Sequence, residues 1–543
     1  MTEKRADVPT FGNFVGGEWV EAVGGGTFES LNPADTRDVV GRFQASGAAD
    51  AAMGVRAAEV AGPAWRRTPA PKRAEVMYRF AALLAEHKER LARAMTREMG
   101  KVLAEARGDV QEGIDIAFLM AGEGRRMFGD TVPSELPDKW AMSVREPLGV
   151  AAIVTPWNFP IAIPCWKMMP ALIAGNTVVW KPASDTPGSA ALLVELLDRA
   201  GFPAGTVNLV TGSGGDAGMP LVESPDVDVI SFTGHAETGI RIAQVAARRL
   251  KRVALELGGK NAIIVMDDAD LDLAVDGIVW SAFGTSGQRC TACSRVIAHE
   301  RILDPLLDRL ADRTGRLRLG DGLAESTDVG PLVNAGAMAK VSGYADLARA
   351  EHTVVCGGRP ATDRPGLEHG HFFEPTIVRG VRPMDRLAQE EIFGPLLSVI
   401  SVPDYDSAVT ALNQTPYGLS ASIYTRGVDT AFRAMRDVRA GLVYVNAGTI
   451  GAETHLPFGG MKGSGNGHRE AGHAALDTFT EWKAIYVDFA EADYKGVGER
   501  RLWENPRAAQ LGFDRPQVGH GQQDPSLPRD HQSKPAPEAR REC

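Results

Sequence analysis

The chain has 543 residues, of which 44% are hydrophobic and 24% are charged, and its formal net charge at pH 7 is -10. This length is enough for about two to four domains, each with a sizeable core. The composition excludes a globally disordered, collagen-like or disulfide-framework protein. The acidic balance argues against a nucleic-acid partner and against a surface that seeks anionic lipid.

The five cysteines are few and odd in number. The first residues contain no apolar segment of the kind a signal peptide needs, and no stretch reaches the roughly 18 continuous apolar residues of a membrane span. We therefore expect a protein of the reducing cytoplasm with no membrane partner. In that compartment a functional cysteine acts as a thiol rather than as half of a disulfide.

The pattern of apolar residues changes along the chain. Around residues 14–33, alternating apolar and polar residues near glycine clusters predict hairpin strands. From Lys72 to about Arg126, apolar residues recur every three or four positions, which predicts helices. Between residues 149 and 259, and again over about 261–446, short apolar runs alternate with helix-like segments. This alternation is typical of a parallel sheet covered on both faces, an α/β fold.

Two glycine-rich segments are candidates for nucleotide binding. Gly212, Gly214 and Ala217 form a loose dinucleotide-binding fingerprint after a strand, but such a match is often only a strand-to-helix turn. The second is a buried strand that leads into Gly234 and Gly239 just before a helix. A helix N-terminus there offers free N–H groups to phosphate, whereas the alternative role of these glycines is close packing of the helix on the sheet.

Cys290 lies in the polar segment GQRCTAC, next to Arg289. A lone cysteine is usually an inert core residue, but a nearby cation can lower the pKa of a thiol on a polar loop. Cys293 completes a Cys-x-x-Cys spacing, yet no second pair of ligands with matching spacing exists, so we expect no metal site. We interpret Cys293 as a core residue.

Three polar residues interrupt or end apolar runs. Glu256 lies in RVALELGG, where burial would raise its pKa and suit it to general-base chemistry. Lys181 ends the run VVWK, and Asn158 lies between two prolines in PWNFP. Taken alone, Glu256 could be solvated and the other two could serve turn chemistry.

Together these segments resemble the aldehyde dehydrogenase superfamily over about residues 14–487. The similarity rests on seven motifs in one order: PWNFP at 156–160, KPAS at 181–184, SFTGHAETG at 231–239, LELGGKN at 255–261, GQRC at 287–290, EEIFGP at 390–395 and PFGGMKGSG at 457–465.

The resemblance implies an NAD(P)-dependent oxidoreductase that acts on an aldehyde substrate. Cys290 matches the nucleophile, which forms a thiohemiacetal, passes a hydride to the nicotinamide and becomes a thioester. Asn158 matches the side-chain donor to the oxyanion. Glu256 matches the base that activates the hydrolytic water.

The same resemblance implies a set of residues that bind NAD or NADP. Lys181 matches the residue that holds the adenosine ribose and Glu391 the one that holds the nicotinamide ribose, while Gly234 and Gly239 lie beside the pyrophosphate. The Gly212 fingerprint is not the phosphate site of this superfamily. The expected set is completed by Thr155, Trp157, Ser184, Phe232, His235, Leu257 and Phe393.

Two positions depart from common family patterns. Many NAD-selective relatives carry an acid three residues after the ribose lysine, where it would repel a 2′-phosphate, whereas this chain has Ser184. NADP is therefore not excluded by like charge. At position 235 relatives commonly have Ser, and this chain has His235.

The implied fold is α/β, with a Rossmann-like cofactor domain, an α/β catalytic domain and a small β oligomerisation element, in a homodimer or homotetramer. We expect the cofactor domain in residues 1–128 and 148–258 and the catalytic domain in 259–458. The oligomerisation element is expected in 129–147 and 476–489, followed by a C-terminal extension at 490–543.

The presence of Glu256 also helps to decide between two products, a free carboxylic acid and an acyl-coenzyme A. Superfamily members that transfer the acyl group to coenzyme A tend to lack this base, so its presence favours hydrolysis to a free carboxylate. A catalytically idle binding or structural protein is a further alternative. The complete set of Cys290, Glu256 and Asn158 argues against it.

Substrate choice rests on weaker signals. The segment around Glu112 and the loop IGAET with Glu453 resemble antiquitin-type enzymes, which oxidise α-aminoadipate semialdehyde and pair a tunnel acid with its amino group. The segment after Asn158 is more similar to bacterial α-ketoglutarate-semialdehyde dehydrogenases, whose substrate is an anion. The alternative is that both acids are solvated. An amino-acid-derived or keto-acid semialdehyde is expected, in a tunnel lined by Glu112, Trp166, Arg289, Thr291, Glu453 and Phe458.

The chain continues for 54 residues beyond the strand-like segment AIYVDF. Few apolar residues occur there, which favours a solvated tail. Trp503, Leu511 and Phe513 are exceptions. They favour a second hypothesis, an arm that anchors on the body or on a neighbouring subunit and partly covers a substrate entrance.

Overall fold

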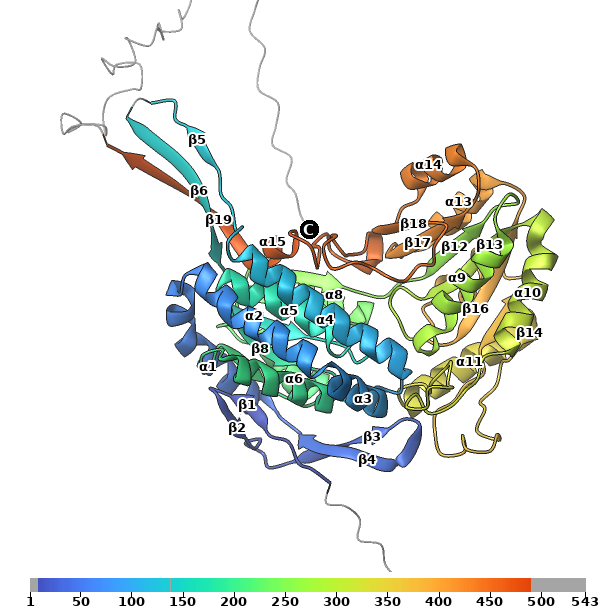
Figure 1. Ribbon diagram of the computed structural model, residues 1–543, viewed down its shortest axis with the longest axis horizontal. Helices are drawn as coiled ribbons and strands as arrows, with labels where there is room; N and C mark the ends of the chain where they lie inside the picture. Colours follow the sequence, from blue (N-terminus) through green and yellow to red (C-terminus); the bar gives the residue numbers. More distant parts are fainter. Residues whose placement is uncertain (1–7, 137, 490–543) are drawn as a thin grey trace, which may run out of the picture. The chain divides into compact units, whose positions relative to one another are not determined.

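The computed structural model describes residues 8–136 and 138–489 (Figure 1). Within them the chain forms two compact units. One comprises the described residues up to 129 together with 144–483, and the other comprises 130–143, without 137, together with 484–489. The hypotheses about the C-terminal extension lie outside the described residues.

The first large sheet of the larger unit has seven strands, five of which run parallel. Its other two strands form the hairpin expected near the N-terminus, in which Phe14 is paired with Trp19. In sheet order the strands are β11 (Arg252–Glu256), β10 (Val229–Thr233), β7 (Val150–Val154), β8 (Thr177–Lys181), β9 (Val207–Leu209), β1 (Asn13–Val15) and β2 (Glu18–Val20).

Helices cover both faces of this sheet because its strands are apolar on both sides. Ile153 and Trp180 pack with α2 to α6 in one core cluster, whereas Ala152 and Val179 face α1, α7 and α8 in another. The helices of this part are α1 (Ala48–Arg67), α2 (Ala70–Glu86), α3 (Lys88–Met99), α4 (Leu103–Glu123), α5 (Ala162–Ala174), α6 (Pro187–Ala200), η1 (Gly214–Gly218), α7 (Met219–Glu223), α8 (Ala236–Ala247) and α15 (Ala475–Phe479).

The second large sheet of the same unit also has seven strands, all parallel to their neighbours except β14, which runs antiparallel to β15. In sheet order they are β14 (Thr353–Cys356), β15 (Thr376–Arg379), β16 (Leu396–Val402), β13 (Cys293–His299), β12 (Asn261–Val265), β17 (Ser420–Tyr424) and β18 (Leu442–Val445).

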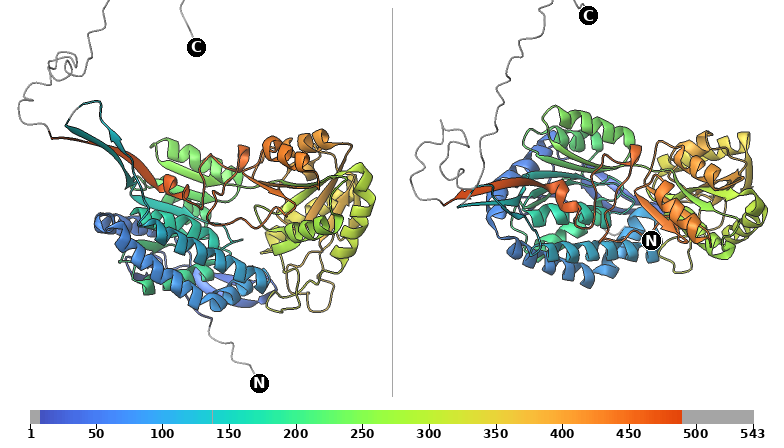
Figure 2. Two further views of the ribbon diagram at one scale, coloured as in Figure 1. Left: turned by 45° about the horizontal axis from the view of Figure 1, so that its top comes forward. Right: turned by 90° about the horizontal axis from the view of Figure 1, so that it is seen from above.

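Both faces of the second sheet are covered as well (Figures 1 and 2). Ile263 packs with α9 and α10, and the next residue, Ile264, packs with α11 to α14 on the other face. The helices here are α9 (Leu271–Phe283), η2 (Gly284–Gly287), η3 (Glu300–Ile302), α10 (Leu303–Gly315), α11 (Ala335–Glu351), α12 (Arg386–Gln389), α13 (Tyr405–Asn413), α14 (Val428–Asp437) and η4 (Lys462–Ser464).

Two small sheets complete the fold. β3 (Thr27–Asn32) and β4 (Asp35–Gln44) form an antiparallel pair. β5 (Thr131–Pro133), β6 (Lys139–Pro147) and β19 (Thr480–Asp488) form a three-stranded sheet in the order β19-β6-β5. The smaller unit takes its described residues from these strands and their connections, at 130–143, without 137, and 484–489.

The α/β class expected from the sequence is confirmed, and so are the helices expected over 72–126, which are α2, α3 and α4. The boundaries of the cofactor, catalytic and oligomerisation domains stay predictions. Among the described residues, no helix is long and apolar enough to cross a membrane.

Candidate active site

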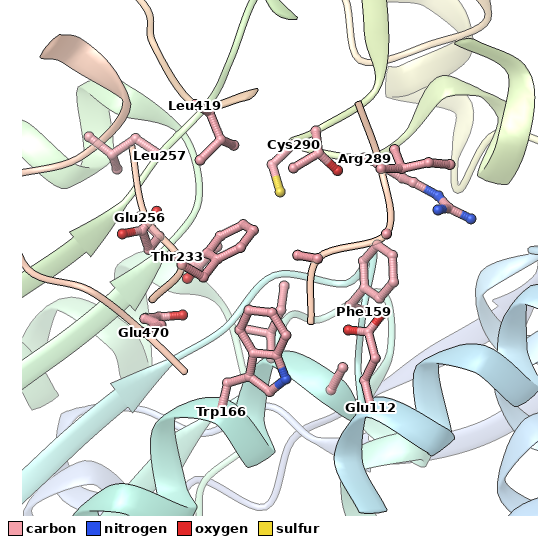
Figure 3. Close-up of a pocket in the computed structure, with 17 residues that line it drawn as sticks. Glu112, Phe159, Trp166, Thr233, Glu256, Leu257, Arg289, Cys290, Leu419 and Glu470 are labelled. Carbon is pink, nitrogen blue, oxygen red and sulfur yellow. The ribbon is translucent and has the colours of Figure 1, made fainter. Parts of the chain in front are cut away.

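One pocket brings together residues from widely separated parts of the larger unit (Figure 3). It has a free volume of about 60 Å³ and lies where β10, β11, α4 and α5 meet the loop that carries Cys290. Its lining comprises Glu112, Phe159, Ala162, Ile163, Trp166, Thr233, Glu256, Leu257, Arg289, Cys290, Thr291, Leu419, Ile450, Gly451, Ala452, Phe458 and Glu470.

The Cys290 loop is hydrogen-bonded to the second sheet. Asn261, the first residue of β12, donates from Nδ2 to the backbone oxygens of Cys290 at 2.7 Å and Ala292 at 3.0 Å. Burial raises the pKa of the Cys290 thiol to about 12, and the carboxylates of Glu256 and Glu391 act in the same direction. The thiol is therefore neutral at physiological pH and needs a base to become a nucleophile.

Glu256 ends β11, with its carboxyl group in the same pocket as Cys290. Burial, and next the neighbouring Glu470 carboxylate, raises the pKa of Glu256 well above its ordinary range, while Lys167 opposes the shift. Gly460 donates its N–H to Glu256 Oε2 at 3.3 Å. A raised pKa makes the ionised carboxylate a stronger base, which suits Glu256 to general-base chemistry.

The sequence analysis missed two residues that belong to this cluster. Lys167 lies on α5 with a side chain that is 0% exposed, and its Nζ forms an ion pair with Glu470 and donates to Ser231 Oγ at 3.0 Å. Glu470 also lines the pocket. A lysine in the apolar segment AIPCWKMMP was the available signal, because a buried cation needs a carboxylate partner.

Asn158 borders a second pocket, which adjoins the first. The residue is 2% exposed, and its carboxamide Oδ1 has no hydrogen-bond partner among the described residues. Buried polar groups normally have a partner, so this side chain is placed to meet a polar group of a ligand.

The second pocket has a free volume of about 310 Å³ and shares Cys290, Thr233 and Leu257 with the first. It begins at the N-terminus of α8, where no side chain caps the helix after His235. Its lining comprises Pro156, Trp157, Asn158, Thr233, Gly234, His235, Leu257, Gly258, Cys290, Val333, Asn334, Gly336, Ala337, Lys340, Glu391, Ile392 and Phe393.

The residues of the second pocket fit a nicotinamide dinucleotide. The uncapped N–H groups of α8 can meet a pyrophosphate. Glu391 accepts from the Gly259 N–H at 2.8 Å through Oε1, and a Cβ on Gly258 would lie 2.3 Å from Glu391 Oε2, so only glycine leaves room for this carboxylate. The Trp157 and Phe393 rings meet edge to face, 5.5 Å apart.

Several expected cofactor residues do not line this pocket. Lys181 is buried at the end of β8, and burial lowers the pKa of its ammonium to about 8. Ser184 Oγ donates to the Gly212 oxygen at 2.9 Å, and Thr155 Oγ1 accepts from Trp180 Nε1 at 2.9 Å. Phe232 and Gly239 pack closely against Gly234 and Leu257, respectively.

The other end of the first pocket holds the expected tunnel residues except one. Glu112 points up from α4 toward Phe159, whereas the Arg289 guanidinium points away from the space before the Cys290 sulfur (Figure 3). Arg289 forms an ion pair with Glu105 at 3.1 Å. Burial, then Asp109, raises the pKa of Glu112 to about 8.

Of the remaining tunnel residues, Trp166 and Phe458 pack edge to face 5.0 Å apart, and Thr291 also lines the pocket. Glu453 is not among the lining residues. Its side chain is 67% exposed and pairs with His455 at 3.3 Å, because its loop turns it toward solvent. The expectation for Glu453 therefore needs correction: it follows the alternative of a solvated acid.

No group of His, Cys, Asp or Glu among the described residues could hold a metal ion. Cys293 donates from Sγ to the Arg295 oxygen at 3.3 Å inside a core cluster of the second sheet.

The chain belongs to the aldehyde dehydrogenase family, whose model matches residues 19–485. It is therefore an NAD(P)-dependent oxidoreductase that acts on aldehydes, as the resemblance implied.

Individual relatives are similar over nearly their whole length. The α-ketoglutarate semialdehyde dehydrogenase of Haloferax volcanii is 42% identical over 88% of this chain and 99% of the relative. The aminoacetaldehyde dehydrogenase of Pseudomonas aeruginosa is also 42% identical, over 88% and 95%. Among solved structures, betaine aldehyde dehydrogenase from Staphylococcus aureus in complex with NAD⁺ matches with a TM-score of 0.86 and 33% identity, over 89% of this chain and 96% of that one.

Proposed function

We propose that the protein oxidises a semialdehyde to the free carboxylic acid, with Cys290 as nucleophile and Glu256 as the base for deacylation. The observation that carries this proposal is the position of Cys290 at the junction of the two pockets. One pocket holds the carboxyl group of Glu256, and the other fits the dinucleotide. A thiol at that junction can meet substrate and cofactor together.

In the first half-reaction the Cys290 thiol loses its proton and the sulfur adds to the aldehyde carbon. Glu256, whose carboxyl group lines the same pocket, receives the proton. Asn158 Nδ2 and the Cys290 N–H stabilise the oxyanion that forms. When bound, NAD or NADP accepts the hydride that leaves the substrate carbon. The α8 N-terminus and Glu391 would hold it, with Lys181 at the adenosine ribose.

Before the second half-reaction Glu256 releases the thiol proton to solvent. It then takes a proton from water, which attacks the thioester carbonyl and releases the acid and the Cys290 thiolate. Glu470 and Lys167, which form an ion pair with each other, shift the pKa of Glu256 in opposite directions, Glu470 upward and Lys167 downward. Transfer of the acyl group to coenzyme A is the alternative outcome. Glu256 disfavours it, and product analysis with and without coenzyme A separates the two.

We infer that the substrate is an amino-acid-derived semialdehyde. Glu112 is the acidic side chain at the far end of the pocket from Glu256, and no described residue forms an ion pair with it. A protonated amine on the substrate would give Glu112 the partner that its burial calls for. The relative named aminoacetaldehyde dehydrogenase is consistent with a cationic group on the substrate.

A keto-acid semialdehyde is the second candidate. Two relatives, at 40% and 42% identity, are named α-ketoglutaric or α-ketoglutarate semialdehyde dehydrogenase. Arg289 lines the pocket and could meet a carboxylate, but only if it turned from its ion pair with Glu105. Equal identity to relatives with oppositely charged substrates means that sequence similarity does not decide between them.

A matched pair of substrates tests the role of Glu112. We expect wild type to prefer α-aminoadipate semialdehyde over adipate semialdehyde, which lacks only the amine. The preference is measured as the ratio of the kcat/KM values for these two compounds. In Glu112→Gln this ratio should fall by about 10- to 100-fold, the effect of removing a charge-assisted hydrogen bond. The ratio should rise as pH increases through about 8, because Glu112 then becomes an anion. It should be flat in the variant.

Asp115→Asn is the matched control, since Asp115 lies on the same helix, is exposed and does not line the pocket. An unchanged ratio in Glu112→Gln would eliminate the amine contact. A wild type that oxidises α-ketoglutarate semialdehyde far better than either compound would support the second candidate.

Ser184 supports a proposal about the cofactor, namely that the enzyme accepts NADP as well as NAD. No carboxylate stands at position 184, and the Ser184 hydroxyl is engaged with the Gly212 oxygen. We expect Ser184→Glu to raise the KM for NADP at least about tenfold through like-charge repulsion, with little effect on NAD. Steady-state kinetics with both cofactors measure this. An equal rise for both cofactors would contradict the proposed position of the 2′-phosphate.

We further propose that the protein is a cytoplasmic homodimer or homotetramer. In the smaller unit Val132, Trp140 and Tyr486 are large apolar side chains that are more than half exposed, as is common at subunit interfaces. The described cysteines are free, as expected in a reducing compartment. Sedimentation velocity measures the oligomeric state, and a monomer at micromolar concentration would contradict the first part.

A further inference from the structure

The segment just before Cys290 has an unusual backbone. Thr285, Ser286 and Gly287 have φ angles of 51°, 57° and 70°. Three successive residues in the left-handed region are rare, because an L side chain there crowds its own backbone. Gly287 suits this conformation, and a Cβ on it would lie 2.3 Å from the Gly394 oxygen. Thr285 and Ser286 do not, so their surroundings must hold them.

Glu105 is the main contact that holds Thr285. Both of its carboxylate oxygens accept from the Thr285 N–H at 2.9 Å, and Oε2 also accepts from Thr285 Oγ1 at 3.0 Å. Arg289, on the other side of the turn, donates from Nε to Thr285 Oγ1 at 2.9 Å and pairs with Glu105 at 3.1 Å. One carboxylate on α4 therefore contacts both Thr285, where the turn begins, and Arg289, two residues after it ends. This carboxylate is nearly buried, with a side chain 12% exposed.

The opposite side of the turn is held by backbone groups of the segment 330–333. Ser286 Oγ donates to the Gly330 oxygen at 2.7 Å. Gln288 donates to the Pro331 oxygen at 3.2 Å and accepts from the Val333 N–H at 3.0 Å. These contacts hold the turn against the segment that leads into α11. Among the described residues, Glu105 is the side chain from outside the loop that forms hydrogen bonds with Thr285.

We propose that Glu105 is a positioning residue, which holds the left-handed turn at 285–287 and thereby fixes the Cys290 sulfur at the junction of the two pockets. This inference rests on the proposed role of Cys290 as nucleophile. Glu105 contacts neither pocket, so it acts through the turn. If the carboxylate is removed, the turn can relax to ordinary backbone angles, and the sulfur moves with it.

A rapid-mixing experiment with aldehyde and NAD in excess over enzyme tests the proposal in the Glu256→Gln background, where deacylation is slow. The burst gives the rate at which the reduced cofactor forms, and its amplitude gives the fraction of active sites. We expect Glu105→Ala to lower this rate by about 10- to 100-fold, the effect of a misplaced reacting group, at an unchanged amplitude. The Kd for NAD should change less than twofold, because Glu105 does not line the second pocket. Glu105→Gln should recover part of the rate, because its amide oxygen can still accept from the Thr285 N–H.

A purely structural role would instead lower the amplitude and the melting temperature while the remaining sites react at the wild-type rate, and that result would overturn the proposal. Asp115→Asn on the same helix is the control and should match wild type. If Glu105→Ala does not fold, Glu105→Gln decides, because it keeps an acceptor for the Thr285 N–H but loses the ion pair with Arg289. Slow acylation at full amplitude would support the proposal, and a wild-type rate would refute it. Retained turnover in Cys290→Ala would instead show that the proposed function is wrong.

Discussion

Replacing Cys290 with Ala should lower kcat by about 10,000-fold or more, since removing a nucleophile eliminates the covalent route. Cofactor binding should survive, because the second pocket has many lining groups besides the Cys290 side chain. Absorbance at 340 nm with NAD or NADP measures turnover. Quenching of tryptophan fluorescence on titration with NAD measures binding.

Cys293→Ala is the matched control for this variant. Cys293 is three residues away, but its Sγ is buried against the second sheet and donates to the Arg295 oxygen. We expect near-normal kcat and a modest loss of stability from the small cavity. A Cys290→Ala variant that binds NAD and retains turnover would refute the nucleophile assignment, and so would a Cys293→Ala variant that is folded but inactive.

Replacing Glu256 with Gln should stop the reaction after its first half. Acylation of Cys290 can continue at a reduced rate, whereas attack of water on the thioester loses its base, so steady-state turnover should fall by about 100- to 10,000-fold. Rapid mixing should show one equivalent of reduced cofactor per active site, followed by a slow phase. A variant whose slow phase equals the wild-type rate would contradict the role of Glu256.

The pH dependence follows from the same residue. The pKa of Glu256 is raised by burial, and only its ionised form can accept a proton. The deacylation rate in wild type should therefore increase with pH as Glu256 ionises, over a range above the ordinary pKa of a glutamate. In Glu256→Gln it should depend much less on pH. Turnover that falls over this range in wild type would contradict the assignment.

The α/β class, the helices over 72–126 and the family were predictable from the sequence, because local periodicity and seven ordered motifs carry that information. The prediction also named Cys290, Glu256 and Glu112, which line one pocket. Glu256 is a carboxylate within an apolar run and Cys290 a thiol in a polar segment, whereas Glu112 was named from the resemblance of its segment to a known family.

Residues that act through tertiary contacts were not predictable in this way. The partners Lys167 and Glu470 are 303 positions apart, and Glu105 meets Thr285 across 180 positions. Neither pairing leaves a local pattern. The left-handed angles at Thr285 and Ser286 gave no signal either, because these residue types do not favour that region. Glu453 shows the opposite error, since a motif-like loop says nothing about which way a side chain turns.

The most direct test of the proposed chemistry is peptide mass spectrometry of Glu256→Gln after reaction with aldehyde and NAD in the absence of coenzyme A. The result we expect is an acyl group, the aldehyde less one hydrogen, added in place of the thiol hydrogen on the peptide that contains Cys290. Wild type under the same conditions should release the free acid and keep little adduct. An acyl group on another residue, or turnover in the variant with no adduct on Cys290, would contradict the mechanism.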